Sequence, residues 1–144
     1  MLVRDVLSLK GSAIYSIESA EPLTRAVKLM VDRDVGSLVV IDGGRMVGML
    51  TFREVLGALN GEAAIADLQT RDVMVSEVVC GTPGDTIDEL RDLMTRERVR
   101  YLPVKEGEQL LGIVSFHDVA KAVIKETSME NRLLKRYIES QPSE

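Results

Sequence analysis

Two stretches of this chain each contain two apolar runs separated by a short polar turn, and the second stretch repeats the first. Residues 35–55 and 99–119 align without a gap when the first stretch is shifted by 64 positions. The matched pairs include Leu38 with Leu102, Val40 with Val104, Gly48 with Gly112, Phe52 with Phe116 and Val55 with Val119. An internal match of this length indicates a tandem duplication. Each copy predicts an apolar strand, a tight turn, a second apolar strand and the start of a helix.

Glycine lies in the predicted turn between the two strands of each copy. The turns are expected at Asp42-Gly43-Gly44 and at Lys105-Glu106-Gly107. Glycine adopts positive φ angles without a steric penalty, which suits a hairpin. A hydroxyl residue, Thr51 or Ser115, then opens the next helix of each copy.

A helix with one apolar face is predicted ahead of each hairpin. Its apolar positions are Leu23, Ala26, Val27, Met30 and Val31 in copy one and Ile87, Leu90, Leu93 and Met94 in copy two. Pro22 suits the first turn of one helix, and Thr86 with Glu89 fits a capping box for the other. Short strands are expected before these helices, at Ala13–Ile17 and Glu77–Gly81. The order β-α-β-β-α predicts a mixed α/β fold, of the α+β kind, built from two pseudo-symmetric repeats.

The duplication divides the chain into repeat 1 (residues 1–62), repeat 2 (residues 63–125) and a C-terminal segment (residues 126–144). Repeats of about sixty residues are close to the smallest size that supports a core, so they are expected to pack on each other. The C-terminal segment predicts an amphipathic helix to about residue 140 and a fraying end. Its apolar residues are Met129, Leu133, Leu134, Tyr137 and Ile138. We expect this helix to serve assembly.

Copy one also contains three residues that copy two lacks. The segment Arg4-Asp5-Val6-Leu7 resembles Arg71-Asp72-Val73-Met74, but at an offset of 67 positions instead of 64. The additional residues therefore lie near Lys10-Gly11-Ser12, in the connection before the first predicted strand.

Composition and charge narrow the function classes. The 144 residues carry a formal net charge of −5 and no block of Lys and Arg, so no nucleic acid partner is expected. Cys80 and His117 are the only residues of their types, which excludes a disulfide framework and a Cys/His zinc site. No long apolar run, paired carboxylates or activated nucleophile is found in the sequence. We therefore expect a cytoplasmic protein with no membrane span, no metal and no enzymatic activity.

The order and spacing of the motifs resemble those of a known family. Asp-Val-Leu or Asp-Val-Met precedes the first strand of each copy, and Leu102-Pro103-Val104 lies in the second strand of copy two. Gly48-x-x-Thr51-x-x-Glu54 and Gly112-x-x-Ser115-x-x-Asp118 mark the start of the last helices. Over about residues 3–123 this arrangement resembles a tandem pair of cystathionine β-synthase (CBS) domains, the Bateman module, as in stand-alone CBS-domain proteins.

The resemblance implies two clefts between the repeats that bind adenosine compounds such as AMP, ADP, ATP or S-adenosylmethionine as regulatory ligands, with no cofactor required. In copy two it implies that Asp118 holds the ribose hydroxyls and that Ser115 contacts ribose or phosphate. Arg100 is implied near the phosphate. The residues implied near the base are Leu102, Pro103 and Val104. His117, in the first helical turn, either touches phosphate or faces solvent.

Copy one departs from the pattern of the family. Glu54 replaces the usual aspartate, and Gly36 and Val39 stand where copy two has Arg100 and Pro103. Thr51, Glu54 and Arg53 are therefore the candidate ligand-binding residues of a weaker second site.

The proposed chemistry competes with a simpler interpretation of the same residues. A carboxylate can accept bonds from both ribose hydroxyls, and a helix N-terminus attracts phosphate. Gly48 and Gly112 lack a Cβ atom, so backbone and ligand could approach closely beside them. However, Thr51 with Glu54, and Ser115 with Asp118, are also spaced as capping boxes, which need no ligand. The two interpretations are compatible.

The sequence supports two candidate functions. The first is an adenosine-compound sensor that transmits occupancy to an unidentified protein target or through its own dimer. The alternative is a structural or assembly subunit whose clefts are degenerate and empty. In either case we expect a homodimer, because short repeats leave apolar helix faces that pairing would cover.

Overall fold

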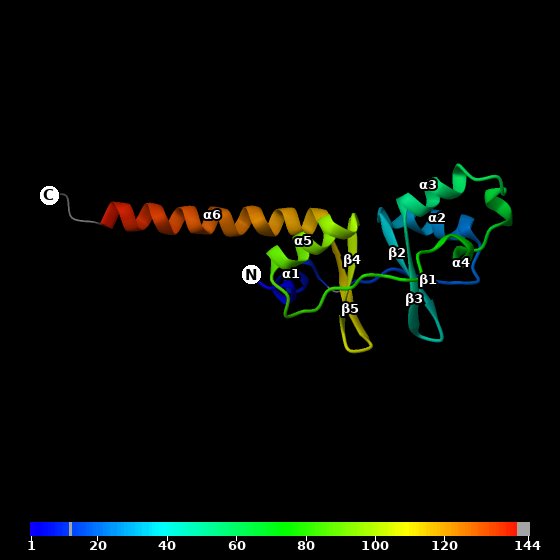
Figure 1. The fold of residues 1–144 in the computed structure, drawn as a ribbon, viewed down its shortest axis with the longest axis horizontal. Helices are drawn as coiled ribbons and strands as arrows, with labels where there is room; N and C mark the ends of the chain where they lie inside the picture. The colour runs from blue at the N-terminus through cyan, green and yellow to red at the C-terminus, as the bar shows by residue number, and fades with distance from the viewer. Residues whose placement is uncertain (12, 141–144) are drawn as a thin grey trace. The chain divides into compact units, whose positions relative to one another are not determined.

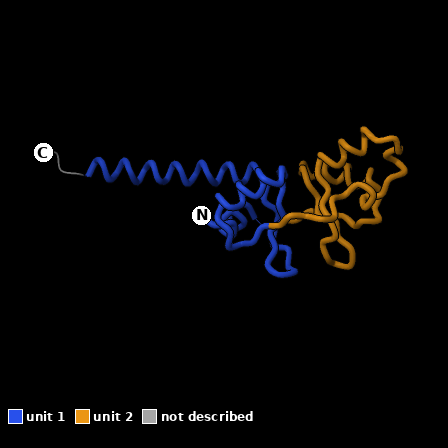
Figure 2. The backbone as a smooth tube through the Cα atoms, viewed as in Figure 1, with its two compact units in different colours: residues 1–12, 81–144 blue, residues 13–80 orange. Residues whose placement is uncertain are grey.

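The computed structural model describes residues 1–11 and 13–140, and its backbone forms two compact units (Figure 2). Unit 1 consists of residues 1–12 and 81–144, and unit 2 consists of residues 13–80. Each unit therefore combines residues of both sequence repeats. The chain begins in the unit that is built mainly on copy two, passes through the other unit, and returns.

Unit 2 is a three-stranded sheet with helices packed against it (Figure 1). Strand β1 (Ser16–Glu18) runs parallel to β2 (Ser37–Asp42), which pairs antiparallel with β3 (Arg45–Thr51). The other elements are α2 (Leu23–Arg33), α3 (Phe52–Leu59), the 3-10 helix η1 (Ile65–Asp67) and α4 (Thr70–Val73). The buried core consists of Ile17, Leu23, Ala26, Met30, Leu38, Val40 and Leu50.

Unit 1 places three helices around one hairpin (Figure 1). Strands β4 (Tyr101–Glu106) and β5 (Gln109–Ser115) pair antiparallel, and the helices are α1 (Val3–Lys10), α5 (Ile87–Glu97) and α6 (Phe116–Ser140). The fully buried side chains include Val3, Ile87, Leu90, Met94, Leu102, Val104 and Val114. Helix α1 contacts both β5 and α6. The predicted α+β class is confirmed.

The two hairpins share their register and their irregularities. Val40 faces Gly48 in one hairpin and Val104 faces Gly112 in the other, and a shift in register follows both Val40 and Val104. The predicted turn glycines have positive φ angles, with values of 55° at Gly43, 77° at Gly44 and 61° at Gly107. The duplication is therefore visible in the backbone as well as in the sequence.

The strand predicted at Glu77–Gly81 is wrong. Within that segment Gly81 alone pairs, as an isolated parallel bridge to Val104. After this bridge the chain turns: the amide and the hydroxyl of Thr82 donate to the carboxylate of Asp85, at 2.9 and 2.7 Å. The corresponding strand of copy one does form, but at Ser16–Glu18 instead of Ala13–Ile17.

The two predicted amphipathic helices are present, with one error on the first. Helix α2 buries Leu23, Ala26 and Met30, whereas Val31 is 72% exposed and lies outside the apolar face. In α5 the Thr86 hydroxyl accepts a hydrogen bond from the amide of Glu89 at 3.1 Å, which caps the helix. The return bond of the predicted capping box, from the amide of Thr86 to the Glu89 carboxylate, does not form.

Helix α6 is one unbroken helix of 25 residues that runs through residues 125 and 126. Figure 2 shows its C-terminal half projecting from the rest of unit 1. The predicted apolar residues of this half are each more than half exposed: Met129, Leu133, Leu134, Tyr137 and Ile138. An exposed apolar set of this size indicates an interaction surface. Residues 141–144, where fraying was predicted, lie outside the described residues.

Candidate functional site

Ser115 and Asp118 meet where strand β5 ends and helix α6 begins. The amide of Asp118 donates to Oγ of Ser115 at 3.1 Å, and the amide of Ser115 donates to Oδ2 of Asp118 at 2.9 Å. This reciprocal arrangement is a capping box, and it satisfies two amides near the helix start. The capping interpretation therefore holds for copy two.

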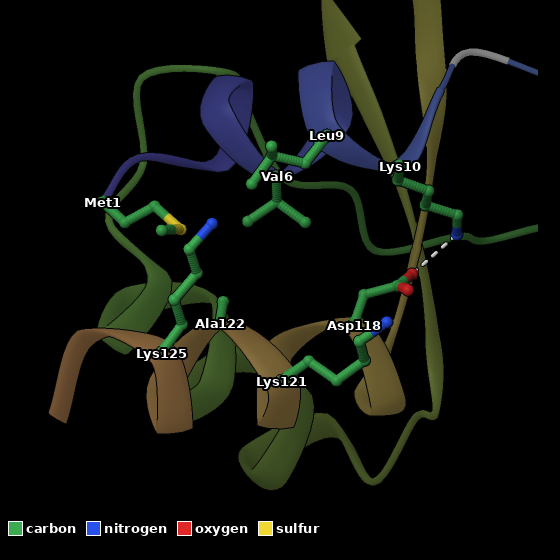
Figure 3. A pocket seen from close by; sticks show the side chains of 8 residues that line it. All are labelled: Met1, Val6, Leu9, Lys10, Asp118, Lys121, Ala122 and Lys125. Atoms are coloured by element: carbon green, nitrogen blue, oxygen red, sulfur yellow. Dashed lines mark hydrogen bonds and ion pairs between the residues drawn. The ribbon is translucent and has the colours of Figure 1, made fainter. Parts of the chain in front are cut away.

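The side chain of Lys10 reaches the same carboxylate from helix α1. Its ammonium nitrogen lies 2.6 Å from Oδ2 of Asp118 and 2.7 Å from the carbonyl oxygen of Ile113 on β5 (Figure 3). The Lys10 ammonium and the Ser115 amide thus donate to the same oxygen, Oδ2. Oδ1 of Asp118 stays outside these two bonds.

This environment keeps Asp118 ionised. Partial burial of the side chain, which is 17% exposed, raises the pKa of Asp118. The hydrogen bonds from Lys10 and Ser115, together with the positive charge of Lys10, outweigh that effect and hold the pKa below its usual value. At neutral pH the site therefore presents a carboxylate, which accepts hydrogen bonds and donates none.

Copy one contains the equivalent cap but uses its carboxylate differently. Oε1 of Glu54 accepts from the amide of Thr51 at 2.9 Å, and the Thr51 hydroxyl lies 3.0 Å from both Oε1 and Oε2. Among the described residues, no lysine or arginine forms an ion pair with Glu54. Both oxygens of Glu54 are therefore engaged within its own helix start.

A backbone bridge explains why unit 2 needs no counterpart of Lys10. Met49 is the repeat equivalent of Ile113, and its carbonyl oxygen accepts from the amide of Val75 at 2.9 Å. In unit 1 the Lys10 ammonium takes the place of that amide at the Ile113 carbonyl. The equivalent carbonyl oxygen therefore accepts from a backbone amide in unit 2 and from a lysine side chain in unit 1.

Arg100 lies beside the start of α6. Its carbonyl oxygen accepts from the amide of Phe116 at 2.8 Å, which brings the backbone of Arg100 next to the Ser115 cap. The side chains of Arg100 and His117 are exposed in unit 1, and that of Arg53 is exposed in unit 2. Their predicted contacts with phosphate stay predictions.

The three predicted base-contacting residues of β4 are buried. Leu102 and Val104 have exposed fractions of 0%, and Pro103 is also buried. Leu102 and Val104 point to one face of the strand and Pro103 to the other, because successive side chains alternate. Any contact of Leu102 or Val104 with a base would require these side chains to leave the core.

Gly48 and Gly112 allow close approach of other parts of the protein, and at Gly48 the approaching atoms include backbone, as expected. A Cβ atom at Gly112 would meet Cδ2 of Leu7 at 2.8 Å, and one at Gly48 would meet both Sδ of Met74 and the carbonyl oxygen of Val75 at 2.7 Å. Because these glycines lack a Cβ atom, α1 packs closely against one hairpin at Gly112, and the residues that follow α4 pack closely against the other at Gly48.

Sequence reasoning missed Lys10, Lys121 and Lys125. Lys10 falls among the extra residues of copy one, so the repeat alignment assigned it no partner. The displaced offset was the one available signal that this segment differs between the copies. Lys121 and Lys125 line the pocket in Figure 3. In the sequence they have the spacing of any two lysines on a solvent-exposed helix face, so nothing distinguished them as pocket residues.

Two searches of the described residues gave negative results. No group of three or more His, Cys, Asp or Glu side chains is arranged to hold a metal ion among the residues that the structure describes. None of the helices in the described part of the chain combines the length and the apolar character needed to cross a membrane.

Comparison with known proteins identifies the repeats. The CBS domain model matches residues 3–61 and 71–125. The CBS domain-containing protein YhcV of Bacillus subtilis is 31% identical over 120 residues, which are 82% of each chain. The crystal structure of a CBS-domain containing protein from Agrobacterium tumefaciens is 31% identical, has a TM-score of 0.82, and matches 85% of this chain and 98% of that chain.

Other similar proteins differ in length or share mainly the fold. An uncharacterized 33.4 kDa protein of Thermofilum pendens is 38% identical over 106 residues, which are 72% of this chain but 34% of that protein, so this chain spans about a third of it. A CBS domain pair crystallised with 5-methylthioadenosine and S-adenosyl-L-methionine has a TM-score of 0.76 at 20% identity, and the match covers 88% of this chain and 98% of that chain. At this identity the likeness concerns the fold.

Proposed function

The chain belongs to the CBS domain family, and on this premise we propose that it is a regulatory binding module that senses adenosine compounds such as AMP, ADP, ATP or S-adenosylmethionine. The two family matches cover most of the chain. A CBS domain pair with the same fold binds 5-methylthioadenosine and S-adenosyl-L-methionine, which supports a ligand of this class.

The carboxylate of Asp118 carries the proposal. It is ionised and largely buried, and the bonds from Lys10 and Ser115 both end on Oδ2. Oδ1 is therefore the oxygen that a ribose hydroxyl would use, and a charge-assisted hydrogen bond of this kind is stronger than a neutral one. The capping box and the ion pair hold the carboxylate in place, so little side-chain freedom would be lost on binding.

We further propose that copy two holds the stronger site. Both oxygens of Glu54 already accept bonds from Thr51, so a ribose hydroxyl would have to share one of them. Oδ1 of Asp118, by contrast, takes part in neither of the bonds from Lys10 and Ser115.

The cap of copy two also has two cationic residues close by: Lys10, which comes from copy one and pairs with Asp118, and Arg100, whose backbone lies beside the cap. Copy one has Gly36 in the position of Arg100. Positive charge near the cap favours ligands that carry phosphate.

Helix α6 offers a route for transmitting occupancy. Asp118 lies in its first turn, and the exposed apolar residues Leu133, Tyr137 and Ile138 lie on its C-terminal half. Because the helix is unbroken, a shift of its first turn on ligand binding would move this apolar surface as well. The proposed reader of that movement is a second copy of the chain or an unidentified protein target.

A second candidate function is favoured by the completed caps. Ser115 with Asp118, and Thr51 with Glu54, satisfy their helix starts without any ligand atom. A structural or assembly subunit with no ligand would need nothing more from these motifs.

A thermal-shift panel separates the two functions. The full chain is heated with AMP, ADP, ATP, S-adenosylmethionine or NAD, and GMP serves as a control that shares ribose and phosphate with AMP. A ligand at a hundredfold excess over its Kd stabilises the native state by about 2.7 kcal/mol, which raises the melting temperature by several degrees. At least one adenosine compound is expected to do so and GMP is not. If no adenosine compound changes the melting temperature, the structural function replaces the sensor.

A further inference from the structure

A pocket of about 480 Å³ opens within unit 1 between helices α1 and α6 (Figure 3). Its apolar lining includes Val6 and Leu9 from α1 and Ala122 from α6. Leu9 is 66% exposed, although it sits beside two nearly buried residues, Val6 and Ala122. The volume lies within the range of pockets that bind small molecules.

The pocket carries an excess of positive charge. Three lysines line it, namely Lys10, Lys121 and Lys125. Two of its cationic groups are neutralised: Lys10 pairs with Asp118, and the amino group of Met1 pairs with Glu126. Neither Lys121 nor Lys125 takes part in an ion pair with another described residue. These two ammonium groups are therefore available to an anion.

Lys121 and Lys125 are one helical turn apart on α6. Side chains at this spacing are neighbours, with about 6 Å between their Cβ atoms. In Figure 3 the Lys121 side chain extends toward Asp118, so the two ammonium groups reach one anionic group after Lys121 changes rotamer. In Figure 3 the Lys125 side chain extends from α6 toward α1. An anion bound there would lie next to the apolar surface of Leu9 and Val6.

We propose that this pocket binds a small organic anion with an apolar body, of which an aryl phosphate monoester is the simplest example. Lys121 and Lys125 hold the phosphate, and Val6, Leu9 and Ala122 contact the apolar body. The combination explains why an apolar side chain as large as Leu9 stays exposed beside unpaired lysines. The pocket shares Lys10 and Asp118 with the proposed adenosine site, but the inference rests on Lys121, Lys125 and Leu9, which were not assigned to that site.

The test follows phenyl phosphate binding to the full chain by ¹H–¹⁵N NMR at low salt. Resonances of Leu9 and Ala122 are expected to shift, and the affinity is expected to fall as salt is added, because exposed charge pairs are screened. The double variant Lys121→Gln/Lys125→Gln should weaken binding about tenfold or more. The matched control is Arg132→Gln/Arg136→Gln, which removes two charges at the same spacing on the exposed half of α6 and should change the Kd less than about twofold.

The Leu9→Ser variant separates the two halves of the pocket. It should weaken phenyl phosphate binding while leaving the weak binding of inorganic phosphate unchanged, because the lysines remain. AMP affinity should stay the same in the Lys121→Gln/Lys125→Gln variant. The proposal is overturned if Leu9 and Ala122 do not shift at millimolar phenyl phosphate, if both double variants weaken binding equally, or if AMP affinity falls together with that of phenyl phosphate.

Discussion

The ammonium nitrogen of Lys10 lies 2.6 Å from Oδ2 of Asp118, although the two residues are 108 positions apart in the chain. The pair joins the first helix of the chain to the first turn of α6 within unit 1. One carboxylate thereby caps a helix, pairs with a lysine and keeps Oδ1 outside both bonds. Stability and proposed ligand binding are therefore linked at Asp118.

This link predicts a pH dependence of stability. The pKa of Asp118 is lower in the folded chain than its usual value, so the folded state favours the ionised form. Its stabilising contribution is complete above the ordinary carboxyl pKa of about 4 and is lost as pH falls through the lowered folded value. Asp118→Asn should therefore reduce the free energy of unfolding at pH 7, and the deficit should shrink below about pH 4.

Urea unfolding at a series of pH values measures this difference. Asp92→Asn, on the exposed side of α5, is the matched control and should change the free energy of unfolding little at any pH. A deficit of Asp118→Asn that is equal at pH 7 and at low pH would contradict the account.

The two hairpin glycines should respond unequally to alanine. A Cβ atom at Gly112 would meet the end of a flexible side chain, Cδ2 of Leu7, whereas one at Gly48 would meet the backbone oxygen of Val75. Gly48→Ala should therefore cost about 1–3 kcal/mol of unfolding free energy, as overpacked cores do, and Gly112→Ala should cost less. Urea denaturation measures the free energy of unfolding of both variants. An equal loss in the two variants, or a larger loss in Gly112→Ala, would contradict the packing described for α1 and α4.

Much of the fold followed from local pattern. The helix faces follow from apolar residues at a spacing of 3.6 residues, and the hairpins follow from apolar runs on both sides of a glycine turn. Both patterns can be recognised in a single sequence. The strand predicted at Glu77–Gly81 was wrong, because its apolar composition suits pairing but only Gly81 of this described segment forms a β-bridge, to Val104. Whether a segment finds a partner strand depends on tertiary context and not on its own composition.

The site was less accessible to sequence reasoning. The spacing of Ser115 and Asp118 identified the cap, but the family resemblance was needed to suggest a ligand. Lys10 could not be assigned, because its contact with Asp118 depends on α1 packing with elements of the second copy in unit 1. The close approach at the glycines was expected, but its partners could not be named for the same reason: Gly112 meets Leu7, which is far away in sequence.

The exposed half of α6 predicts self-association. Leu133 and Tyr137 are 62% and 63% exposed and lie one turn apart, so pairing of two chains through this surface would remove apolar area from water. Light scattering should give a mass above the 15.9 kDa of one chain. Leu133→Glu/Tyr137→Glu should return the chain to the single-chain mass and leave AMP affinity within a few fold. A wild-type mass of one chain at micromolar concentration would contradict this prediction.

Arg100 predicts a distinction between nucleotides and nucleosides. Its backbone lies beside the Ser115 cap, and its exposed guanidinium is available to a phosphate. Arg100→Ala should weaken AMP binding about tenfold and leave adenosine binding nearly unchanged. Arg96→Ala, on the preceding helix, is the control by titration calorimetry. Equal losses for AMP and adenosine would remove the phosphate role from Arg100.

The most direct test of the central claim compares the two acidic residues by titration calorimetry with AMP. Asp118→Ala removes one partner of a charged hydrogen bond and should weaken binding about ten- to a hundredfold, whereas Glu54→Ala should weaken it clearly less. Each variant also loses a capping interaction of about 1 kcal/mol, so its folding is first checked by circular dichroism. A loss confined mainly to Asp118→Ala supports an adenosine-compound sensor with one strong site, and unchanged AMP affinity in folded Asp118→Ala would contradict it.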